Sequence, residues 1–219
     1  MIPIQYALRR RMMINVSKGL PISDLPLGTL IRIADSDGGQ GAANYEIADK
    51  DNFMAGGVVL VRKNIHSKSA FGSSITYPGG TLDNKMTSIY NSLPERLQSK
   101  IMDATFALES SGSITRKVFA LTYTMAGFGA NNGTTEGKAL RHYTNNANRI
   151  KTYSGTADYW WLSSRSSAFN SSRYVNASGT VDYYGSSSIS RGVVPAFVIP
   201  ADAVYDPTPN ADGSYNLVL

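Results

Sequence analysis

Short runs in which apolar and polar residues alternate recur along this chain, and turn-forming residues separate them. The clearest pair occupies residues 173–177 and 180–184, on either side of a Ser-Gly dipeptide. Residues 29–34 and 44–50 form a second pair around a glycine-rich loop. Alternation turns one face of a strand toward a core, so both pairs predict β-hairpins.

Helices are expected in three parts of the chain. Residues 2–16 begin near a proline that suits the first turn of a helix. Pro94 divides residues 84–108 into two short helices and stands at the start of the second. Residues 135–153 are interpreted as a helix followed by a loop, and the last five residues as an edge strand. Together these segments predict one compact α+β domain with an N-terminal extension.

Several classes of protein are excluded or disfavoured by composition. The chain has no cysteine, so disulfides, cysteine-ligated metals and cysteine nucleophiles are excluded. The net charge is +5, but the basic residues are scattered, so nucleic-acid binding is not expected. No apolar run approaches the roughly 18 residues of a membrane-spanning helix, so no membrane insertion is expected. The N-terminus lacks the apolar core of a secretory signal, which indicates synthesis in the cytoplasm.

Motifs for catalysis are also missing from the sequence. Neither His66 nor His142 stands in a metal-binding spacing, and no nucleophile elbow or phosphate-binding loop occurs. The Asp-Ser-Asp-Gly run at residues 35–38 lacks the later acidic positions of a calcium-binding EF-hand loop. We therefore expect a protein that is not an enzyme and holds no cofactor. A carboxylate pair assembled by the fold stays open, which keeps a glycan-processing enzyme as an alternative.

A segment rich in Ser, Tyr, Asn and Gly occupies residues 163–191, between a Trp-Trp-Leu run and the apolar residues 193–199. Such a composition is typical of antibody paratopes, in which tyrosine supplies contact area and small polar residues supply hydrogen bonds. We interpret the segment as a binding face on a rigid frame. Alternation turns Val175 and Val181 inward and leaves Tyr183 ambiguous. The residues expected to be exposed are Tyr174, Asn176, Asp182 and Tyr184.

A series of motifs carries a resemblance to a known family of domains. The runs YPGGTLDNKM, EGKALRHY, YWWLSSR and SRGVVPAFVIP follow one another in order. The series resembles the C-type-lectin-like domains of phages and prophages of Gram-positive gut bacteria, and IPIQYALRRRMM looks like the start of a phage structural gene. Ser-Ser-Arg replaces the usual Arg-Ser-Pro, and Val194 stands where arginine is common. The implied fold is α+β, of the formylglycine-generating-enzyme subtype, with an antiparallel sheet, two or more helices and long loops.

The resemblance also implies a function. It suggests a virion protein at a phage tail or surface that binds a host cell-surface protein or glycan. Residues 1–27 would attach it to other virion subunits, and residues 28–219 would bind the ligand. Trimers are common among such proteins, and lectin relatives often bind calcium, although this chain shows no specific acidic cluster for it. The alternative is a virion decoration protein with no receptor.

The same family includes the variable proteins of diversity-generating retroelements, such as the major tropism determinant. Retroelement mutagenesis acts on adenines in codons that cannot become those for Lys, Glu, Gln, Met or Trp. Residues 163–194 contain none of these five, although low-charge composition alone would also explain this. The positions predicted to contact a ligand are Ser166, Ser167, Phe169, Asn170, Ser172, Tyr174, Asn176, Ser178, Asp182, Tyr183, Tyr184, Ser186 and Ser188.

Overall fold

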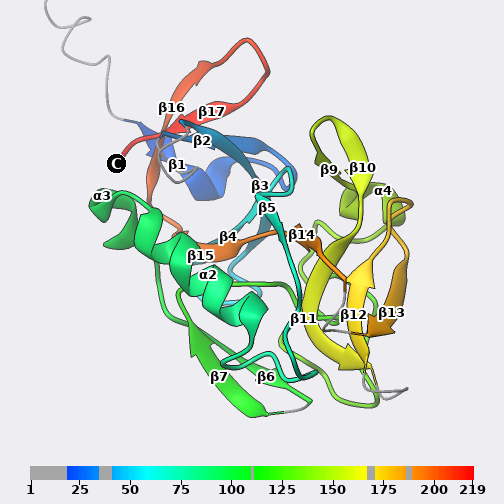
Figure 1. Ribbon diagram of the computed structural model, residues 1–219. Helices are drawn as coiled ribbons and strands as arrows, with labels where there is room; N and C mark the ends of the chain where they lie inside the picture. Colours follow the sequence, from blue (N-terminus) through cyan, green and yellow to red (C-terminus); the bar gives the residue numbers. More distant parts are fainter. Residues whose placement is uncertain (1–18, 35–40, 110, 167–170, 186–188) are drawn as a thin grey trace, which may run out of the picture.

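Two β-sheets make up most of the protein in the computed structural model, with one longer helix packed beside them (Figure 1). The structure describes residues 19–34, 41–109, 111–166, 171–185 and 189–219. The segment predicted to be a helix at residues 2–16 lies outside them. No helix among these described residues is long and apolar enough to cross a membrane.

The larger sheet has eight strands. In order across the sheet they are β1 (Leu20–Pro21), β16 (Val204–Pro209), β17 (Tyr215–Leu217), β2 (Leu30–Ile33), β3 (Ala43–Lys50), β4 (Gly57–Arg62), β15 (Ala196–Pro200) and β8 (Val118–Phe119). The predicted hairpin is confirmed, because β2 pairs antiparallel with β3. The C-terminal strand exists, but β17 lies between β16 and β2, so the expectation of an edge strand is wrong.

The smaller sheet has five strands and carries the serine- and tyrosine-rich segment. Its strands in order are β13 (Val181–Gly185), β12 (Ser171–Val175), β11 (Trp160–Ser166), β14 (Arg191–Val193) and β5 (Ser67–Ser69). The predicted second hairpin is confirmed by the antiparallel pairing of β12 with β13. Only Val194 and Pro195 separate β14 from β15, so the chain passes directly from this sheet into the larger one.

Two further hairpins and four short or medium helices complete the fold. The hairpins are β6 (Ala104–Leu108) with β7 (Gly112–Arg116), and β9 (Lys151–Tyr153) with β10 (Thr156–Asp158). The helices are η1 (Ile22–Asp24), α2 (Thr81–Ser92), α3 (Glu95–Gln98) and α4 (Asn146–Arg149). Pro94 is the N-cap of α3, as predicted. However, α3 ends at Gln98 and β6 begins at Ala104, so the second helix is shorter than expected.

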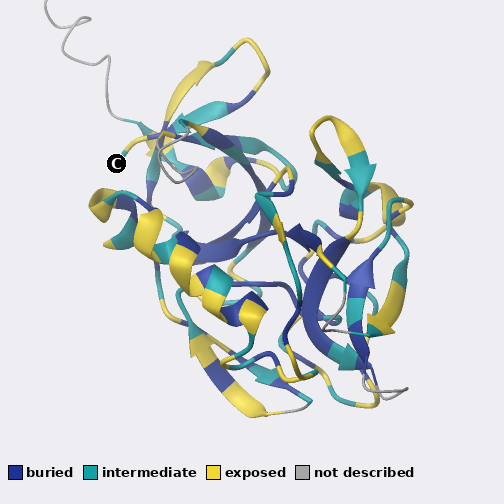
Figure 2. Ribbon diagram, in the orientation of Figure 1, coloured by how far each residue is buried: buried dark blue, intermediate teal, exposed yellow. Residues whose placement is uncertain are grey.

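The core lies along the central strands of both sheets, and Figure 2 shows buried residues running along β4, β15 and β11. All six residues of β4 are buried, because the middle of the sheet is covered on both faces. Trp160 and Trp161 of β11 are fully buried, and their indole N–H groups donate to Arg149 O and Ser69 O. In contrast, the middle of β13 is exposed.

The expected α+β fold of the C-type-lectin type is wrong. Among the described residues, strands hold 42% and helices only 12%. Part of the difference lies in residues 135–153, expected as a helix followed by a loop, where only the four-residue α4 forms and residues 135–144 are not helical. There the N–H of His142 donates to Ala48 O at 3.0 Å and that of Leu140 to Met125 O at 3.1 Å. A helix needs these donors for its own carbonyls four residues back, so tertiary pairing overrides local propensity.

Candidate ligand-binding site

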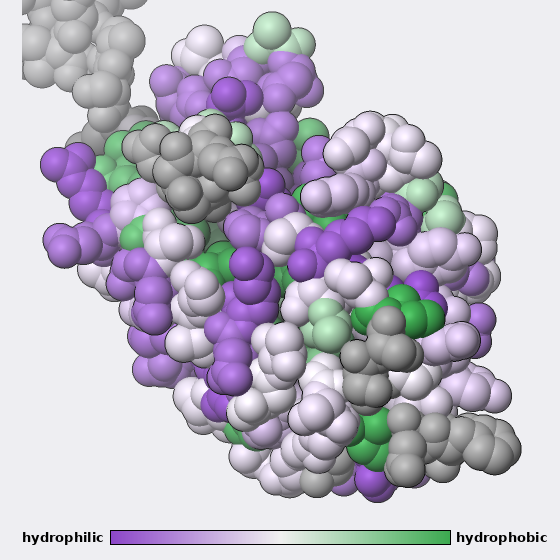
Figure 3. Space-filling model, in the orientation of Figure 1, coloured by the Kyte–Doolittle hydropathy of each residue, from purple (hydrophilic) through white to green (hydrophobic). Residues whose placement is uncertain are grey.

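Exposed tyrosines gather on and beside the five-stranded sheet. Among the described residues, six large hydrophobic side chains are exposed, and four of them are tyrosines of this region. These four are Tyr153, Tyr159, Tyr183 and Tyr184. Figure 3 draws the surface over β11, β12 and β13 mostly in pale tones, which mark residues near the middle of the hydropathy scale. Surfaces with few charges and several amphipathic rings are suited to binding.

The register of the sheet places several aromatic side chains on one face. Trp161 pairs with Tyr174 across β11 and β12, and Tyr174 pairs with Asp182 across β12 and β13. Directly paired residues point to the same face, so these three side chains form a row. Tyr159 stands two residues before Trp161 and Tyr184 two residues after Asp182, so alternation turns both side chains toward this same face. The Trp161 and Tyr159 rings meet Tyr174 edge to face, at 6.0 and 5.8 Å between centroids.

Arg191, the first residue of β14, lies among these rings. Its Cζ atom is 3.5 Å from the centroid of the Tyr174 ring and 5.0 Å from that of Tyr159. The rings of Trp161 and Tyr184 follow at 5.4 and 5.9 Å. A guanidinium this close to ring faces is attracted by the negative charge of the π system. We name this group the tyrosine–arginine cluster: Tyr159, Trp161, Tyr174, Asp182, Tyr184 and Arg191.

Among the described residues, the Arg191 side chain forms no ion pair and donates no hydrogen bond, although its charge helps to lower the pKa of Asp158. Its side chain is only 9% exposed, and its Nε atom is fully enclosed without a partner there. A buried cation normally needs hydrogen bonds or a paired carboxylate, because it has lost its water. The rings of the cluster supply only part of that compensation. Arg191 is therefore a cation held ready for an anion.

The two carboxylates near Arg191 are held by other groups. Asp158 pairs with Lys68 at 2.6 Å and accepts the N–H of Tyr159 at 2.7 Å. Burial disfavours the charged form of Asp158, but Lys68 outweighs it and holds the pKa of Asp158 below its usual value. Asp182 accepts the Tyr174 hydroxyl at 3.1 Å. Burial raises the pKa of Tyr174, so this hydroxyl stays a neutral donor.

The exposure expected for the hairpin is correct in part. Alternation assigned the faces correctly, and Asp182 and Tyr184 are exposed, as are Tyr183 and Ser178. Tyr174 is buried, against expectation, because Arg191, Tyr159 and Trp161 cover its ring. Two further predicted contact residues, Ser166 and Ser172, are also buried in their strands. The remaining predicted positions lie outside the described residues: Ser167, Phe169, Asn170, Ser186 and Ser188.

Asn176, which was expected to face a ligand, instead organises the turn of the hairpin. Its Oδ1 atom accepts the N–H of Ser178 at 3.0 Å and that of Thr180 at 3.2 Å, and its Nδ2 donates to Thr180 Oγ1 at 2.6 Å. The next turn residue, Gly179, has φ +80°, and a Cβ there would overlap Asn146 O of α4. The tip therefore packs closely against α4, and the exposed part of the hairpin is the middle of β13.

Arg191 and Tyr159 were not predicted as site residues. The signal for Arg191 was present, since it stands two residues before Val193 at the start of an apolar run. Alternation therefore turns it to the same side as a buried valine. An arginine turned inward within a tyrosine-rich segment is unusual enough to single out.

Two other buried cations, Lys151 and Arg149, are compensated by protein acceptors. Lys151 is completely buried and donates to Glu46 Oε2, which also accepts the Tyr143 hydroxyl at 3.3 Å. Lys63 donates to the other oxygen of Glu46 at 2.7 Å. Burial alone would raise the pKa of Glu46, but Lys151 and Lys63 together bring it below its ordinary value. This network joins Glu46 of β3 to Lys151 of β9 and to Lys63, which follows β4 directly. We interpret its role as structural.

Arg149, at the end of α4, is the second compensated cation. Its Nε donates to Ala126 O at 2.5 Å, and its Nη2 donates to Tyr143 O at 2.9 Å and to Gly127 O at 3.2 Å. Its Nη1 donates to Asn146 Oδ1 at 3.0 Å. The Phe128 ring lies 4.2 Å from its Cζ. Three segments of the chain are thus joined through one guanidinium.

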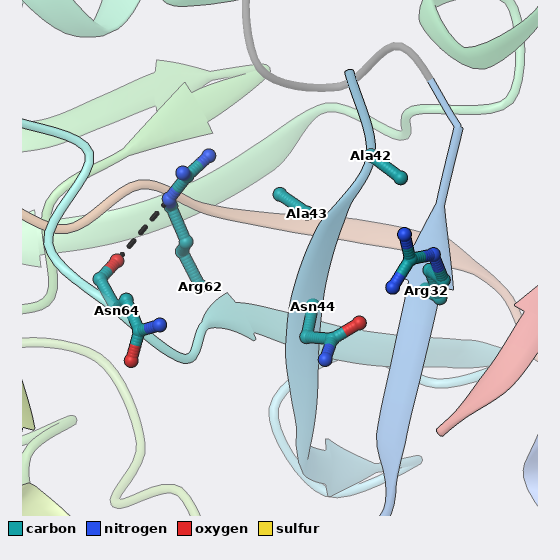
Figure 4. A pocket seen from close by; sticks show the side chains of 6 residues that line it. All are labelled: Arg32, Ala42, Ala43, Asn44, Arg62 and Asn64. Atoms are coloured by element: carbon teal, nitrogen blue, oxygen red, sulfur yellow. Dashed lines mark hydrogen bonds between the residues drawn. The ribbon is translucent and has the colours of Figure 1, made fainter. Parts of the chain in front are cut away.

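A polar hollow of about 260 Å³ lies on the larger sheet (Figure 4). It is lined by Arg32, Ala42, Ala43, Asn44, Arg62 and Asn64. The two guanidinium groups lie on opposite sides of β3 and do not converge. Arg32 lies 3.8 Å from Asp212, and Arg62 Nε donates to Asn64 O at 3.2 Å. Within the described ranges, no group of three or more His, Asp or Glu residues could hold a metal ion.

Comparison with known proteins identifies a family but no function. The family model described as Domain of unknown function (DUF6273) matches residues 55–201, which is more than half of the chain. No curated protein and no solved structure matches. The match includes the whole tyrosine–arginine cluster, whereas Glu46 and strands β1 to β3 lie before it. The chain therefore belongs to the DUF6273 family.

Proposed function

We propose that this member of the DUF6273 family is a ligand-binding protein that recognises a protein or glycan on the surface of a host cell. The binding surface is the tyrosine–arginine cluster. The observation that carries the proposal is a buried, uncompensated arginine beneath exposed tyrosines. A buried charge without acceptors destabilises the free protein. A ligand that supplies an acceptor recovers part of that free energy on binding.

The frame of the cluster supports binding by pre-organisation. Trp161 is fully buried and fixed by its hydrogen bond to Ser69 O at 2.9 Å, and Tyr174 is fixed by Asp182. The hairpin tip packs closely against α4 at Gly179. A rigid surface loses little conformational entropy when a ligand arrives, so more of the contact energy appears as affinity.

We place the protein on a phage virion, at the tail or surface, where it would contact other subunits through residues 1–27. This placement is supported by the resemblance of the sequence motifs to phage proteins. A decoration protein without a receptor is the competing role. It predicts that changes in the cluster disturb the particle and leave adsorption of intact particles unaltered.

Diversification by a retroelement is a further part of the proposal, and the structure restricts where it could act without harm to the fold. Ser178, Tyr183 and Tyr184 are exposed and open to exchange, whereas the exposed Asp182 also holds the Tyr174 hydroxyl. Asn176 holds the turn, so its exchange would disturb the hairpin. A near-identical template repeat beside a reverse-transcriptase gene, differing at adenines, is the genomic observation expected. Its absence removes diversification and leaves ligand binding intact.

The test is adsorption of the purified, labelled protein to a panel of Gram-positive gut bacteria. The double variant Tyr159→Ser and Tyr184→Ser removes the two exposed rings beside Arg191. We expect at least about tenfold weaker binding, the scale of one hot-spot contact or more. The matched control is Leu20→Ser with Val218→Ser, which removes two exposed apolar side chains at the larger sheet. Equal binding by both double variants, or no binding of the unaltered protein to any cell, refutes the proposal.

A further inference from the structure

We propose that the tyrosine–arginine cluster binds a carboxylate-bearing sugar, with Arg191 receiving the carboxylate and Tyr159 and Tyr184 flanking the sugar ring. This inference rests on the proposed function and names the chemical class of its ligand.

The first step is that Arg191 is free to take an anion. No described residue accepts a hydrogen bond from it, and no described carboxylate lies within ion-pair distance. Of its three guanidinium nitrogens only Nε is fully enclosed without a partner, so Nη1 and Nη2 retain contact with solvent. Two terminal N–H groups on one planar fork match the two oxygens of a carboxylate.

The second step is that the surroundings favour a single negative charge. Arg191 brings one positive charge, and Lys68 is already paired with Asp158. Asp158 and Asp182 add negative charge close to the cluster. A phosphate group carries close to two negative charges and would be repelled by these carboxylates. Only one guanidinium is present to offset that repulsion. A carboxylate, with one charge, is balanced by Arg191 alone.

The third step is that the flanking groups suit a sugar better than a peptide strand. Tyr159 and Tyr184 present rings that are 42% and 50% exposed, wide enough to pack against a ring of similar size. β13 is the outer strand of its sheet, where a peptide could add as a sixth strand. However, Asp182 Oδ1 accepts the N–H of Tyr183 at 2.8 Å, which takes that donor away from an added strand.

The experiment is a titration of the full chain with D-glucuronate, D-glucose and inorganic phosphate, followed by the fluorescence of the buried Trp161 and by NMR shifts. We expect saturable binding of glucuronate and at least tenfold weaker binding of glucose and phosphate. Arg191→Gln should weaken glucuronate binding about 10- to 100-fold, the range for a lost charge-assisted hydrogen bond. Arg191→Lys keeps the charge without the fork and should be intermediate.

The matched control is Arg173→Gln. Arg173 belongs to the same hairpin but to the opposite face, where its Cζ lies 4.7 Å from the Tyr123 ring. Glucuronate should bind this variant as it binds the unaltered protein. Circular dichroism and thermal melting of each variant separate a lost site from a lost fold.

Three results overturn the inference: equal binding of glucose and glucuronate, tighter binding of phosphate, or full glucuronate binding by folded Arg191→Gln. The adsorption assay distinguishes this failure from that of the proposed function. If Arg191→Gln adsorbs normally while the Tyr159 and Tyr184 double variant does not, the surface binds cells through another chemistry, such as a protein. If neither change affects adsorption, both proposals fall together.

Discussion

Arg149 and Arg191 are alike in burial and opposite in bonding. They are 5% and 9% exposed, and aromatic rings lie against both guanidinium groups. Arg149 donates to three main-chain carbonyls and one side-chain amide, whereas Arg191 donates to none of the described residues. The first arginine has exchanged water for protein acceptors. The second has given up most of its water and received only rings, which are weaker partners for a cation.

The difference separates a buried arginine that stabilises the fold from one whose burial costs stability. Arg149 lies beneath the hairpin tip and joins loops that hold the smaller sheet in place. Arg191 lies on the tyrosine-rich face, where a ligand can reach its terminal nitrogens. Sites kept at a cost to stability are often sites of function. The two arginines can therefore be told apart by how unfolding and binding respond to substitution.

The largest effect is expected from Glu46→Gln. This change removes the carboxylate that pairs with Lys151. It leaves a fully buried cation with only an uncharged amide oxygen and the Tyr143 ring, 5.5 Å away, beside it. The free energy of unfolding should fall by about 3–5 kcal/mol, the range for breaking a buried ion pair. Urea denaturation at neutral pH measures it. A loss below about 1 kcal/mol would show that burial of an unpaired cation is not costly in this protein, which would undermine the contrast.

Acid provides the control for this variant. The pKa of Glu46 is below its ordinary value in the folded protein, so ionised Glu46 stabilises the fold above about pH 4.5, and this stability is lost as the pH falls through the folded pKa. The difference between the unaltered protein and Glu46→Gln should therefore shrink as the pH falls below that range. A difference that is independent of pH would assign the loss to packing.

Arg149→Met should have the next largest effect. Three buried carbonyl oxygens lose their donor, and each costs about 1–3 kcal/mol when left unsatisfied. We expect a loss of about 3 kcal/mol by urea denaturation. Arg173→Met, at a half-buried arginine of the same region, should change stability by less than about 1 kcal/mol. Similar losses in the two variants would contradict the role of Arg149 as the joint between the loops.

Arg191→Met sharpens the contrast because its effect on stability should be small. The lost cation–π attraction is worth about 0.5–2 kcal/mol. Relief of a poorly solvated charge offsets it, since apolar replacements of buried ions are often neutral or stabilising. We expect a change of less than about 1 kcal/mol together with loss of ligand binding. Destabilisation as large as that of Arg149→Met would make Arg191 a structural residue.

The smallest effect on stability is expected from Tyr184→Ser. The ring is half exposed on an outer strand, so unfolding should change by no more than about 0.5 kcal/mol. Adsorption to cells should nevertheless weaken measurably. Tyr174→Ser is the comparison, because this buried ring supports the cluster and its loss should reduce stability as well. Equal stability losses in the two variants would mean that Tyr184 is part of the frame.

Local pattern predicted hairpins well and the α+β fold poorly. Alternation around Ser178 and Gly179 predicted both β12 and β13 and the face of each side chain, because a strand's period is set by the backbone itself. The helix expected at residues 135–144 failed because its N–H groups find partners far away in sequence, such as Ala48 O. No local pattern contains that information.

The segment that carries most of the candidate site was named from the sequence, but Arg191 at its centre was not. The paratope-like composition pointed to the segment that forms β12 and β13, and Tyr184 and Asp182 were named correctly as exposed. Arg191 was missed because its importance lies in what surrounds it, four rings from three other strands and a loop, and in the acceptors it lacks. The prediction that Tyr174 is exposed failed for a similar reason. Alternation shows to which face a side chain points, but not which other residues cover that face.

The short passage from β14 through Val194 and Pro195 into β15 has a mechanical consequence. Under the proposed function, a pull on a ligand bound at Arg191 would be transmitted along β14 into β15, which is hydrogen-bonded to β4 on one side and β8 on the other. The load therefore enters the larger sheet at β15, the strand next to its β8 edge, and is shared across two strand interfaces. In a single-molecule stretching experiment through the ligand, the main rupture should be that of the sheet or of the ligand contact, without gradual unravelling of a loop beforehand.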